Sequence, residues 1–200
     1  MDFRPPFTRA LGRDIPRVRV SWLRFAVVAA VILAGVWLGR FALHNDIVRA
    51  LVIRYGYGGV FVVALVSGFN LLVPIPAFAF VPLFVASGLD FAVVVALIVA
   101  GVTLADMIGF FLGRAGRDLD MVRHAKIVRR LEKFRARHRL APLVLMALYG
   151  AFAPLPNQVM AVPLGLMGYA SYEVIGPIFI GNVVFNGLAA SGIRFLFMRL

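Results

Sequence analysis

The sequence contains no cysteine, and this absence excludes several kinds of chemistry at once. Without thiols the chain forms no disulfide, no cysteine-ligated zinc or iron–sulfur site and no thiol nucleophile. The three histidines, His44, His124 and His138, lie near polar or basic flanks and match no paired metal-ligand spacing. We therefore predict that the chain has no metal site and no cofactor.

Acidic residues are also scarce: 9 Asp and Glu stand against 21 Lys and Arg, which gives a net charge of +12. Most of the basic residues flank long apolar runs. The expected partners are therefore membrane lipids and their anionic headgroups, and nucleic acid is not expected. No nucleophile–base pair and no phosphate-cradling glycine loop is visible, so we predict that the protein is not an enzyme.

Hydrophobic residues, in contrast, make up 62% of the 200 residues. A soluble domain has about 45–50%, so much of the excess must face lipid. Residues 1–24 are basic, and residues 25–43 form an apolar run that is about 28 Å long as a helix, enough to cross the hydrocarbon core. We predict a retained first transmembrane helix. A cleaved signal peptide is the alternative, but no small-x-small cleavage site follows.

Residues 44–57 alternate apolar and basic side chains in a way that is typical of a short amphipathic helix at the membrane interface. An ordinary connecting helix is the alternative. Two further apolar runs, residues 91–113 and 172–193, are predicted to be transmembrane spans.

Two apolar segments, residues 58–88 and 140–170, carry a Pro-x-Pro pair near their middle. Each pair removes two backbone donors and prevents a continuous helix. In hydrocarbon, broken backbone survives only where protein buries it or where it lines a watery cavity. We therefore predict two re-entrant helical hairpins, with kinked transmembrane helices as the alternative. The predicted hairpin tips are Pro74, Pro76, Pro154 and Pro156.

Polar side chains inside the two spans are candidate functional groups. Asp106 lies beside a stripe of small residues that permits close helix packing, and an acid inside a span is a functional candidate by default. Asn182 and Asn186 lie four residues apart and so share one helix face. The alternative role of all three is packing, through hydrogen bonds between helices.

The basic residues orient these segments, because Lys and Arg prefer the cytoplasmic side. Residues 1–24 place the N-terminus in the cytoplasm. The basic loop, residues 114–139, also falls there if residues 58–88 dip into the membrane and return. A shift by 80 residues aligns the two proline pairs. We predict an all-α integral membrane protein built as an inverted-topology repeat of two re-entrant helical hairpins plus transmembrane helices. Chance matching of apolar sequence is the alternative.

Three motifs resemble those of the DedA family of bacterial membrane proteins, also described as the VTT or SNARE-associated domain. They are NLLVPIP at 70–76, the spacing Gly-x4-Asp-x2-Gly-Phe-x2-Gly-Arg at 101–114, and FAPLPN at 152–157. The resemblance covers about residues 50–192, within a membrane domain predicted at residues 44–193. It implies two opposed re-entrant hairpins, a place in the bacterial inner membrane, and lipid handling: recycling of undecaprenyl phosphate in bacterial members and phospholipid scrambling in eukaryotic relatives.

The chain departs from the family at the hairpins. Phe69 and Phe78 stand where many members have acids, and Ala151 and Asn157 stand where many have arginines. The resemblance therefore indicates a divergent member with a Pro-Asn tip, in which proton-linked acids and phosphate-binding arginines of the hairpins do not carry over.

The predicted function is that of a lipid translocase or scramblase that moves a polyprenyl phosphate or a phospholipid. A small-solute or ion-coupled transporter is one alternative, and a non-transporting membrane-homeostasis or assembly protein is another. Formation of a homo-oligomer is left open. The candidate transport residues, which offer charge or hydrogen bonds along a groove, are Asp106, Arg114, Asn157, Gln158 and Asn186.

Overall fold

The computed structural model describes residues 22–69, 76–117, 119, 126–153 and 156–199. This part of the chain contains helices and no strand, which confirms the predicted all-α class. The elements, in chain order, are α1 (Trp22–Leu43), α2 (Asp46–Gly68), the 3-10 helix η2 (Ala77–Phe80), α3 (Val81–Ala86), α4 (Phe91–Arg117), α6 (Lys126–Arg137), α7 (Ala141–Phe152), α8 (Gln158–Leu166) and α9 (Ser171–Arg199).

Within the described ranges, three helices are long and apolar enough to cross a membrane: α2, α4 and α9. These helices mark the chain as a membrane protein. Helices α4 and α9 contain the predicted spans 91–113 and 172–193. The predicted span at residues 25–43 lies within α1, a helix of 22 residues.

Helix α2 joins two pieces of sequence that the hydrophobic pattern separated. The predicted amphipathic helix and the start of the first broken segment form one 23-residue element with a kink at Gly56, where φ is +51°. Glycine adopts this conformation without a steric penalty. At its start, the Asn45 Oδ1 atom accepts hydrogen bonds from the amides of Ile47 and Val48, each at 3.1 Å. The amphipathic piece is therefore the first part of a kinked helix.

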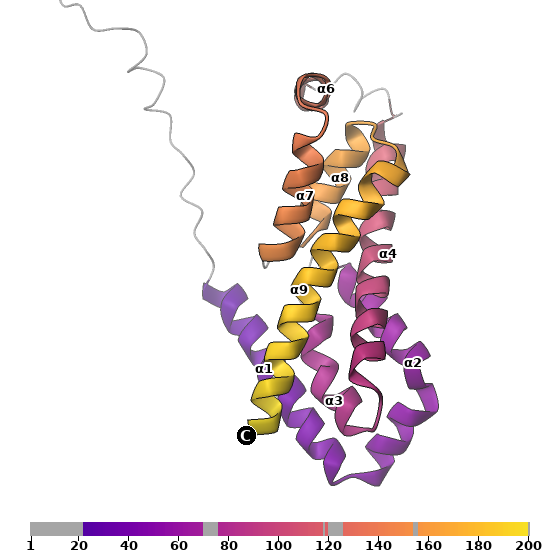
Figure 1. Ribbon diagram of the computed structural model, residues 1–200, viewed down its shortest axis with the longest axis vertical. Helices are drawn as coiled ribbons and strands as arrows, with labels where there is room; N and C mark the ends of the chain where they lie inside the picture. Colours follow the sequence, from indigo (N-terminus) through magenta and orange to yellow (C-terminus); the bar gives the residue numbers. More distant parts are fainter. Residues whose placement is uncertain (1–21, 70–75, 118, 120–125, 154–155, 200) are drawn as a thin grey trace, which may run out of the picture.

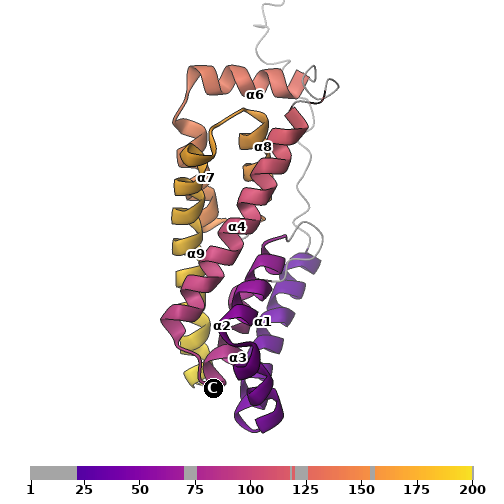
Figure 2. The same cartoon turned by 90° about the vertical axis from the view of Figure 1, so that its right-hand side faces the viewer.

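Helices α4 and α9 lie side by side along the molecule and run in opposite directions (Figures 1 and 2). Helix α6 lies across one end, and α3 lies near the other, close to the connection between α1 and α2. We call these the α6 end and the α3 end. Helices α2 and α8 pack on α4, α7 packs on α9, and α1 packs on α3.

The small residues of α4 form the surface on which the two broken segments pack. A Cβ atom on Gly101 would lie 2.7 Å from the Ala64 Cβ of α2, and one on Gly113 would overlap the Val162 carbonyl of α8. The predicted stripe therefore does permit close helix contact, and it does so with α2 along one part of its length and with α8 along another.

The two ends of each broken segment are bonded to each other. In the first segment, the Asp90 amide donates to the Tyr57 hydroxyl at 3.2 Å. In the second, the Arg139 guanidinium pairs with the Glu173 carboxylate at 2.6 Å, and the Tyr169 hydroxyl donates to the Arg139 carbonyl at 2.7 Å. The residues that flank each broken segment therefore lie next to each other in space.

Two glycines with positive φ stop the short helices of the broken segments. Gly88, at +99°, lies in the short connection between α3 and α4, and Gly168, at +74°, lies in the short connection between α8 and α9. These positions are the equivalent ones under the predicted 80-residue offset. Because glycine alone tolerates this region freely, both chain reversals depend on it.

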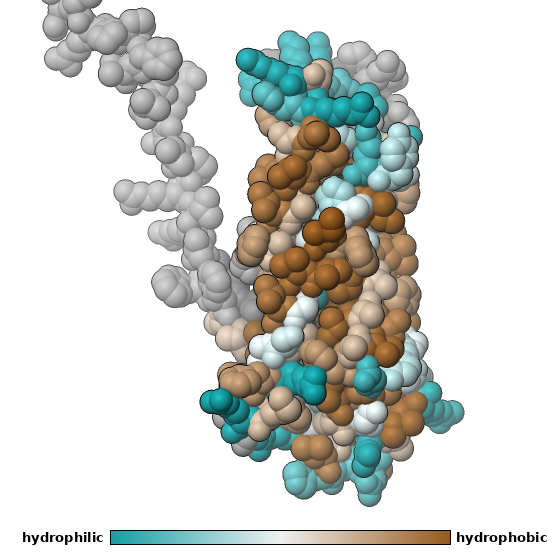
Figure 3. All heavy atoms as spheres, in the orientation of Figure 1, coloured by the Kyte–Doolittle hydropathy of each residue, from teal (hydrophilic) through white to brown (hydrophobic). Residues whose placement is uncertain are grey.

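Apolar side chains cover the middle of the face drawn in Figure 3, and hydrophilic side chains gather at the two ends. Large apolar residues are exposed on the long helices, for example Val66, Leu112 and Leu188, which are 67%, 65% and 65% exposed. A contiguous apolar surface of this kind is typical of a protein that contacts lipid.

Candidate functional site

A layer of buried polar side chains separates two apolar cores. The core at the α3 end includes Ile98 of α4 and Ala190 of α9, whereas the core at the α6 end includes Phe110 and Ile178 of the same helices. Between these positions lie the buried polar residues of α4 and α9, which are Thr103, Asp106, Asn182 and Asn186.

Asp106 is the centre of this layer. Its side chain is 1% exposed, and its Oδ2 atom accepts hydrogen bonds from the Asn157 Nδ2 atom at 3.0 Å and from the Asn182 Nδ2 atom at 2.9 Å. Asn157 comes from the start of α8, and Asn182 comes from α9. One carboxylate oxygen therefore connects a transmembrane helix, the second broken segment and the last helix.

The two amide groups around Asp106 use both of their N–H bonds. Asn182 Nδ2 also donates to the Thr103 hydroxyl at 3.1 Å, and Asn157 Nδ2 also donates to the Asn182 Oδ1 atom at 2.9 Å. We call Thr103, Asp106, Asn157 and Asn182 the central polar cluster. Asn186 extends it by donating to the Asn182 carbonyl at 3.0 Å. Buried polar groups are stable when they are paired in this way.

A buried carboxylate without a cation is costly, because charge loses its hydration in an apolar interior. The ion pairs of the described residues join Arg117 to Glu132 and Arg139 to Glu173, and neither involves Asp106. Compensation comes from the two amide donors instead. An acid that is buried, held by neutral donors and included in neither of these ion pairs is a candidate functional group.

Gln158 links the two broken segments directly. Its Nε2 atom donates to the Gly68 carbonyl at the end of α2, where helix carbonyls lack a partner within the helix. Its Oε1 atom is buried and has no hydrogen-bond partner in the described part of the chain. The side chain is 3% exposed, so the link is enclosed by protein.

The helix breaks occur where the prolines predict them. Helix α2 ends at Gly68 and the next helical residue described is Ala77, whereas α7 ends at Phe152 and α8 begins at Gln158. Pro76 has extended φ/ψ of −72° and 126°, and the Pro156 carbonyl accepts a bond from the Tyr149 hydroxyl at 3.4 Å. The other two predicted tip residues, Pro74 and Pro154, lie outside the described residues.

The structure therefore brings Asp106, Asn157 and Asn186 together around Asn182. Gln158, which follows Asn157 in the chain, bonds to Gly68 instead of to this group. Arg114 does not join them: its side chain is exposed, and it lies about 12 Å further along α4 toward the α6 end. Thr103 was not among the predicted candidates, and Asn182 was named as a candidate functional group but not among the transport residues. The signal for Thr103 was its position three residues before Asp106, on the same helix face.

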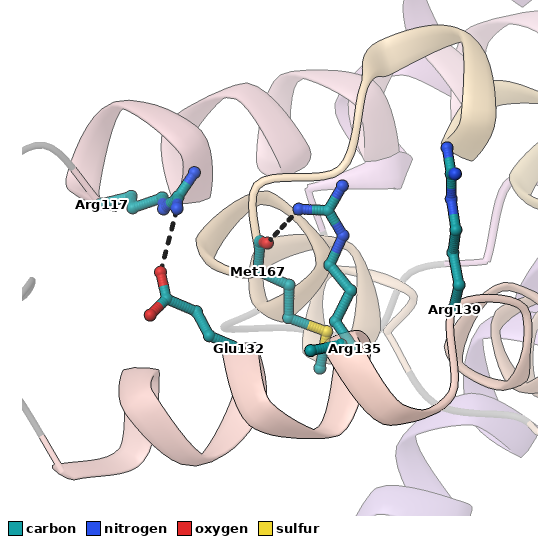
Figure 4. A pocket seen from close by; sticks show the side chains of 6 residues that line it. Arg117, Glu132, Arg135, Arg139 and Met167 are labelled. Carbon is teal, nitrogen blue, oxygen red and sulfur yellow. Dashed lines mark hydrogen bonds and ion pairs between the residues drawn. The ribbon is translucent and has the colours of Figure 1, made fainter.

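A second polar region lies at the α6 end, where the predicted basic loop contains the helix α6. The ion pair between Arg117 and Glu132 measures 2.9 Å, and Arg135 donates to the Met167 carbonyl at 2.9 Å (Figure 4). These four residues and Arg139 line an open cavity of about 540 Å³. The Arg135 guanidinium also lies 4.5 Å from the Tyr169 ring centroid. The α6 end thus presents several guanidinium groups at one opening.

The ion pair with Glu173 has a further effect at this end. The hydrogen bond and the charge of that carboxylate raise the pKa of the exposed Arg139 guanidinium above its usual range. Arg139 therefore carries its positive charge at any physiological pH, as arginine does in general.

Comparisons of the chain with protein-family models, with curated proteins and with solved structures give no match.

Proposed function

We propose that the chain is a membrane translocase for lipids with a phosphate headgroup, as the resemblance to the DedA family implies, and that its two broken segments are re-entrant hairpins of opposite orientation. The observation that carries the proposal is the central polar cluster. It combines a buried acid with the tip of a broken segment, in a layer between two apolar cores.

The lengths of the helices support re-entrant hairpins. Helices α7, α8 and α3 have 12, 9 and 6 residues, so they are about 18, 14 and 9 Å long. Helix α2 is long enough to cross as a whole, but its part beyond the Gly56 kink, residues 57–68, is only about 18 Å long. None of these four pieces spans a hydrocarbon core of about 30 Å. The bonds from Asp90 to Tyr57 and from Arg139 to Glu173 also favour hairpins, because a crossing segment would separate its ends.

The opposite orientation is supported by the direction of the long helices. Helix α4 leaves its hairpin at the α3 end, and α9 leaves its hairpin at the α6 end (Figure 2). The chain reversals at Gly88 and Gly168 then lie on opposite sides of a membrane, as an inverted-topology repeat requires. In this arrangement the basic α6 end faces the cytoplasm, in agreement with the preference of Lys and Arg.

Depth favours a lipid as the substrate. Along α4, Arg117 lies about 16 Å from Asp106, which is close to half the thickness of the hydrocarbon core. If the central polar cluster lies at mid-depth, the arginines of the α6 end lie at the level of phospholipid phosphates. A headgroup then exchanges charged partners at the surface for neutral hydrogen bonds at the centre, while its chains stay among the lipids on the exposed apolar faces.

A lipid-exchange assay tests this function. The purified protein is reconstituted into vesicles that contain a labelled polyprenyl phosphate or a labelled phospholipid, and transbilayer movement is measured at two pH values. We expect the wild type to accelerate movement of at least one lipid and Asp106→Asn to change the rate and its pH dependence. Ser87→Ala, which removes a buried hydroxyl of α3 far from the cluster, is the matched control and should behave as the wild type.

The same vesicles separate the alternatives. Solute flux without lipid movement would contradict the lipid translocase and favour a solute or ion-coupled transporter. No transport of either kind, with wild-type behaviour of Asp106→Asn and Asn157→Ala in cells, would favour a membrane-homeostasis or assembly protein. If Asp106→Asn left the pH profile unchanged, a proton-carrying role for Asp106 would be excluded. The measured transbilayer movement would still decide whether the protein moves lipid.

A further inference from the structure

A small apolar cavity at the α3 end is lined by one cationic side chain, that of Arg194. Its wall is formed by the end of α1, by α3 and by the last turns of α9, and its volume is about 250 Å³. The lining residues are Leu43, Val81, Pro82, Val85, Ala86, Arg194, Phe197 and Met198. This site is far from the arginines of the α6 end, because α9 runs from one end of the molecule to the other (Figure 1).

Among the described residues, the Arg194 guanidinium is not fully paired. Its Nε atom is buried and has no hydrogen-bond partner in this part of the chain, and neither of the two ion pairs found there includes it. The guanidinium carbon lies 4.5 Å from the centroid of the Phe91 ring. The nearby carboxylate of Asp90 instead accepts a bond from the Val93 amide. Arg194 therefore has the capacity to bind an anion.

The depth of Arg194 indicates which anion. Along α9 it lies about 18 Å from Asn182, slightly more than half the thickness of the hydrocarbon core. With the central polar cluster at mid-depth, a placement taken from the proposed function, Arg194 lies at the level of phospholipid phosphates, beside an apolar cavity that suits a lipid chain. The cavity is smaller than the pockets of about 300–1,000 Å³ that enclose whole drug-sized ligands, so it accepts only part of one chain.

We propose that this Arg194 pocket binds one anionic phospholipid, whose phosphate contacts the Arg194 guanidinium and whose chain enters the cavity between α1, α3 and α9. The site holds a lipid in the leaflet at the α3 end, opposite the basic α6 end. It also connects α1 to α9, because the lining residues come from both helices. Lipid binding here does not require that the protein translocate lipids.

Native mass spectrometry of the purified chain tests the site. Phosphatidylglycerol and phosphatidylcholine with identical chains are titrated separately, and inorganic phosphate is a third arm. We expect the wild type to bind phosphatidylglycerol about tenfold more tightly than phosphatidylcholine. Both lipids offer a phosphate, but the choline cation of phosphatidylcholine offsets that charge and is repelled by the guanidinium, whereas phosphatidylglycerol has a net negative charge. Arg194→Gln should lose this preference. Arg199→Gln removes the same charge from the same helix outside the cavity and should keep it.

Two further measurements locate the lipid. Ala86→Phe fills the cavity and should weaken binding of both phospholipids; if it does not fold, Met198→Ala removes a lining side chain and should weaken both. A photoreactive phosphatidylglycerol should label residues 81–86 or 194–198. Equal affinity for the two lipids, equal loss in Arg199→Gln, labelling confined to α6, or phosphate binding as tight as the lipid's would each overturn the proposal.

Discussion

At the scale of single residues, the protein's character depends on how a few buried polar atoms are paired. Asp106 is tolerated because the amides of Asn157 and Asn182 donate to one of its oxygens. Both amides direct all of their N–H bonds into the central polar cluster, so loss of the Asp106 acceptor leaves one donor unpaired on each of them. Substitutions at Asp106 can therefore remove its charge and its hydrogen-bond acceptor separately.

Asp106→Asn and Asp106→Leu should have different effects on stability. Asparagine keeps an oxygen that accepts both bonds and removes the charge, so we expect the stability to be retained within about 1 kcal/mol. Leucine leaves the donors of Asn157 and Asn182 buried without a partner, at about 1–3 kcal/mol for each. Thermal unfolding in detergent measures both. Equal destabilisation by the two variants would contradict the hydrogen-bonding role of the carboxylate.

Gln158→Leu should weaken the link between the two broken segments. Leucine has a similar volume but cannot donate to the Gly68 carbonyl, so we expect a loss of about 1 kcal/mol of stability. Hydrogen exchange of the backbone amides near Gly68 should increase in the same variant. Val159→Leu, at the exposed neighbouring position, is the control and should change neither quantity. Unchanged exchange in Gln158→Leu would show that the link does not hold α2.

At the scale of elements, α4 is the helix on which the fold is assembled. Its small residues let α2 and α8 approach its backbone, and this contact brings Asn157 within reach of Asp106. The prolines by themselves only interrupt the helices of the two broken segments. The glycines of α4 decide where the pieces pack, because a side chain there would hold the helices apart.

Gly165→Ala should lower the stability of the protein, whereas Gly116→Ala should raise it. A Cβ on Gly165 of α8 would overlap the Phe110 carbonyl of α4 and crowd the Arg114 amide at 2.7 Å, so we expect a destabilisation of about 1–3 kcal/mol from overpacking. A Cβ on Gly116 meets nothing within 4 Å, and alanine there should stabilise α4 by up to about 1 kcal/mol. Thermal unfolding measures both, and a neutral Gly165→Ala would contradict the close contact of α8 with α4.

At the scale of the whole molecule, the two broken segments and the long helices α4 and α9 form a body with arginines at both ends and a polar layer at its centre. The α6 end carries an open cavity with several guanidinium groups, and the α3 end carries the Arg194 pocket. These features occur at opposite ends because α4 and α9 run in opposite directions.

The absence of native cysteine makes the topology directly testable. Single cysteines at Arg54 and Asp90 should react with an impermeant maleimide from one side of sealed vesicles, and those at Arg139 and Tyr172 from the opposite side. All four positions are exposed. If the broken segments were kinked crossings instead, the members of each pair would react from opposite sides, and the re-entrant hairpins would be excluded.

The sequence by itself determined the features that depend on local composition. The apolar runs required a membrane, the proline pairs required helix breaks, and the small residues near Asp106 required a close helix neighbour. Local pattern was less informative at residues 44–68, where a change from amphipathic to uniformly apolar character indicated two elements although the chain forms one helix kinked at Gly56. The pattern could not distinguish a boundary from a kink, because glycine is typical of both.

Only the tertiary structure decided which polar groups meet. Asn157 and Asp106 are 51 residues apart, and Gln158 and Gly68 are 90 residues apart. No periodicity in the sequence relates such positions, since their distance depends on how α2, α8 and α9 pack around α4. The same holds for Arg194, which was only a C-terminal charge in the sequence and became a candidate lipid ligand when α1, α3 and α9 enclosed a cavity beside it. Sequence therefore predicted the kinds of element, and the packing of helices that are distant in the chain determined the sites.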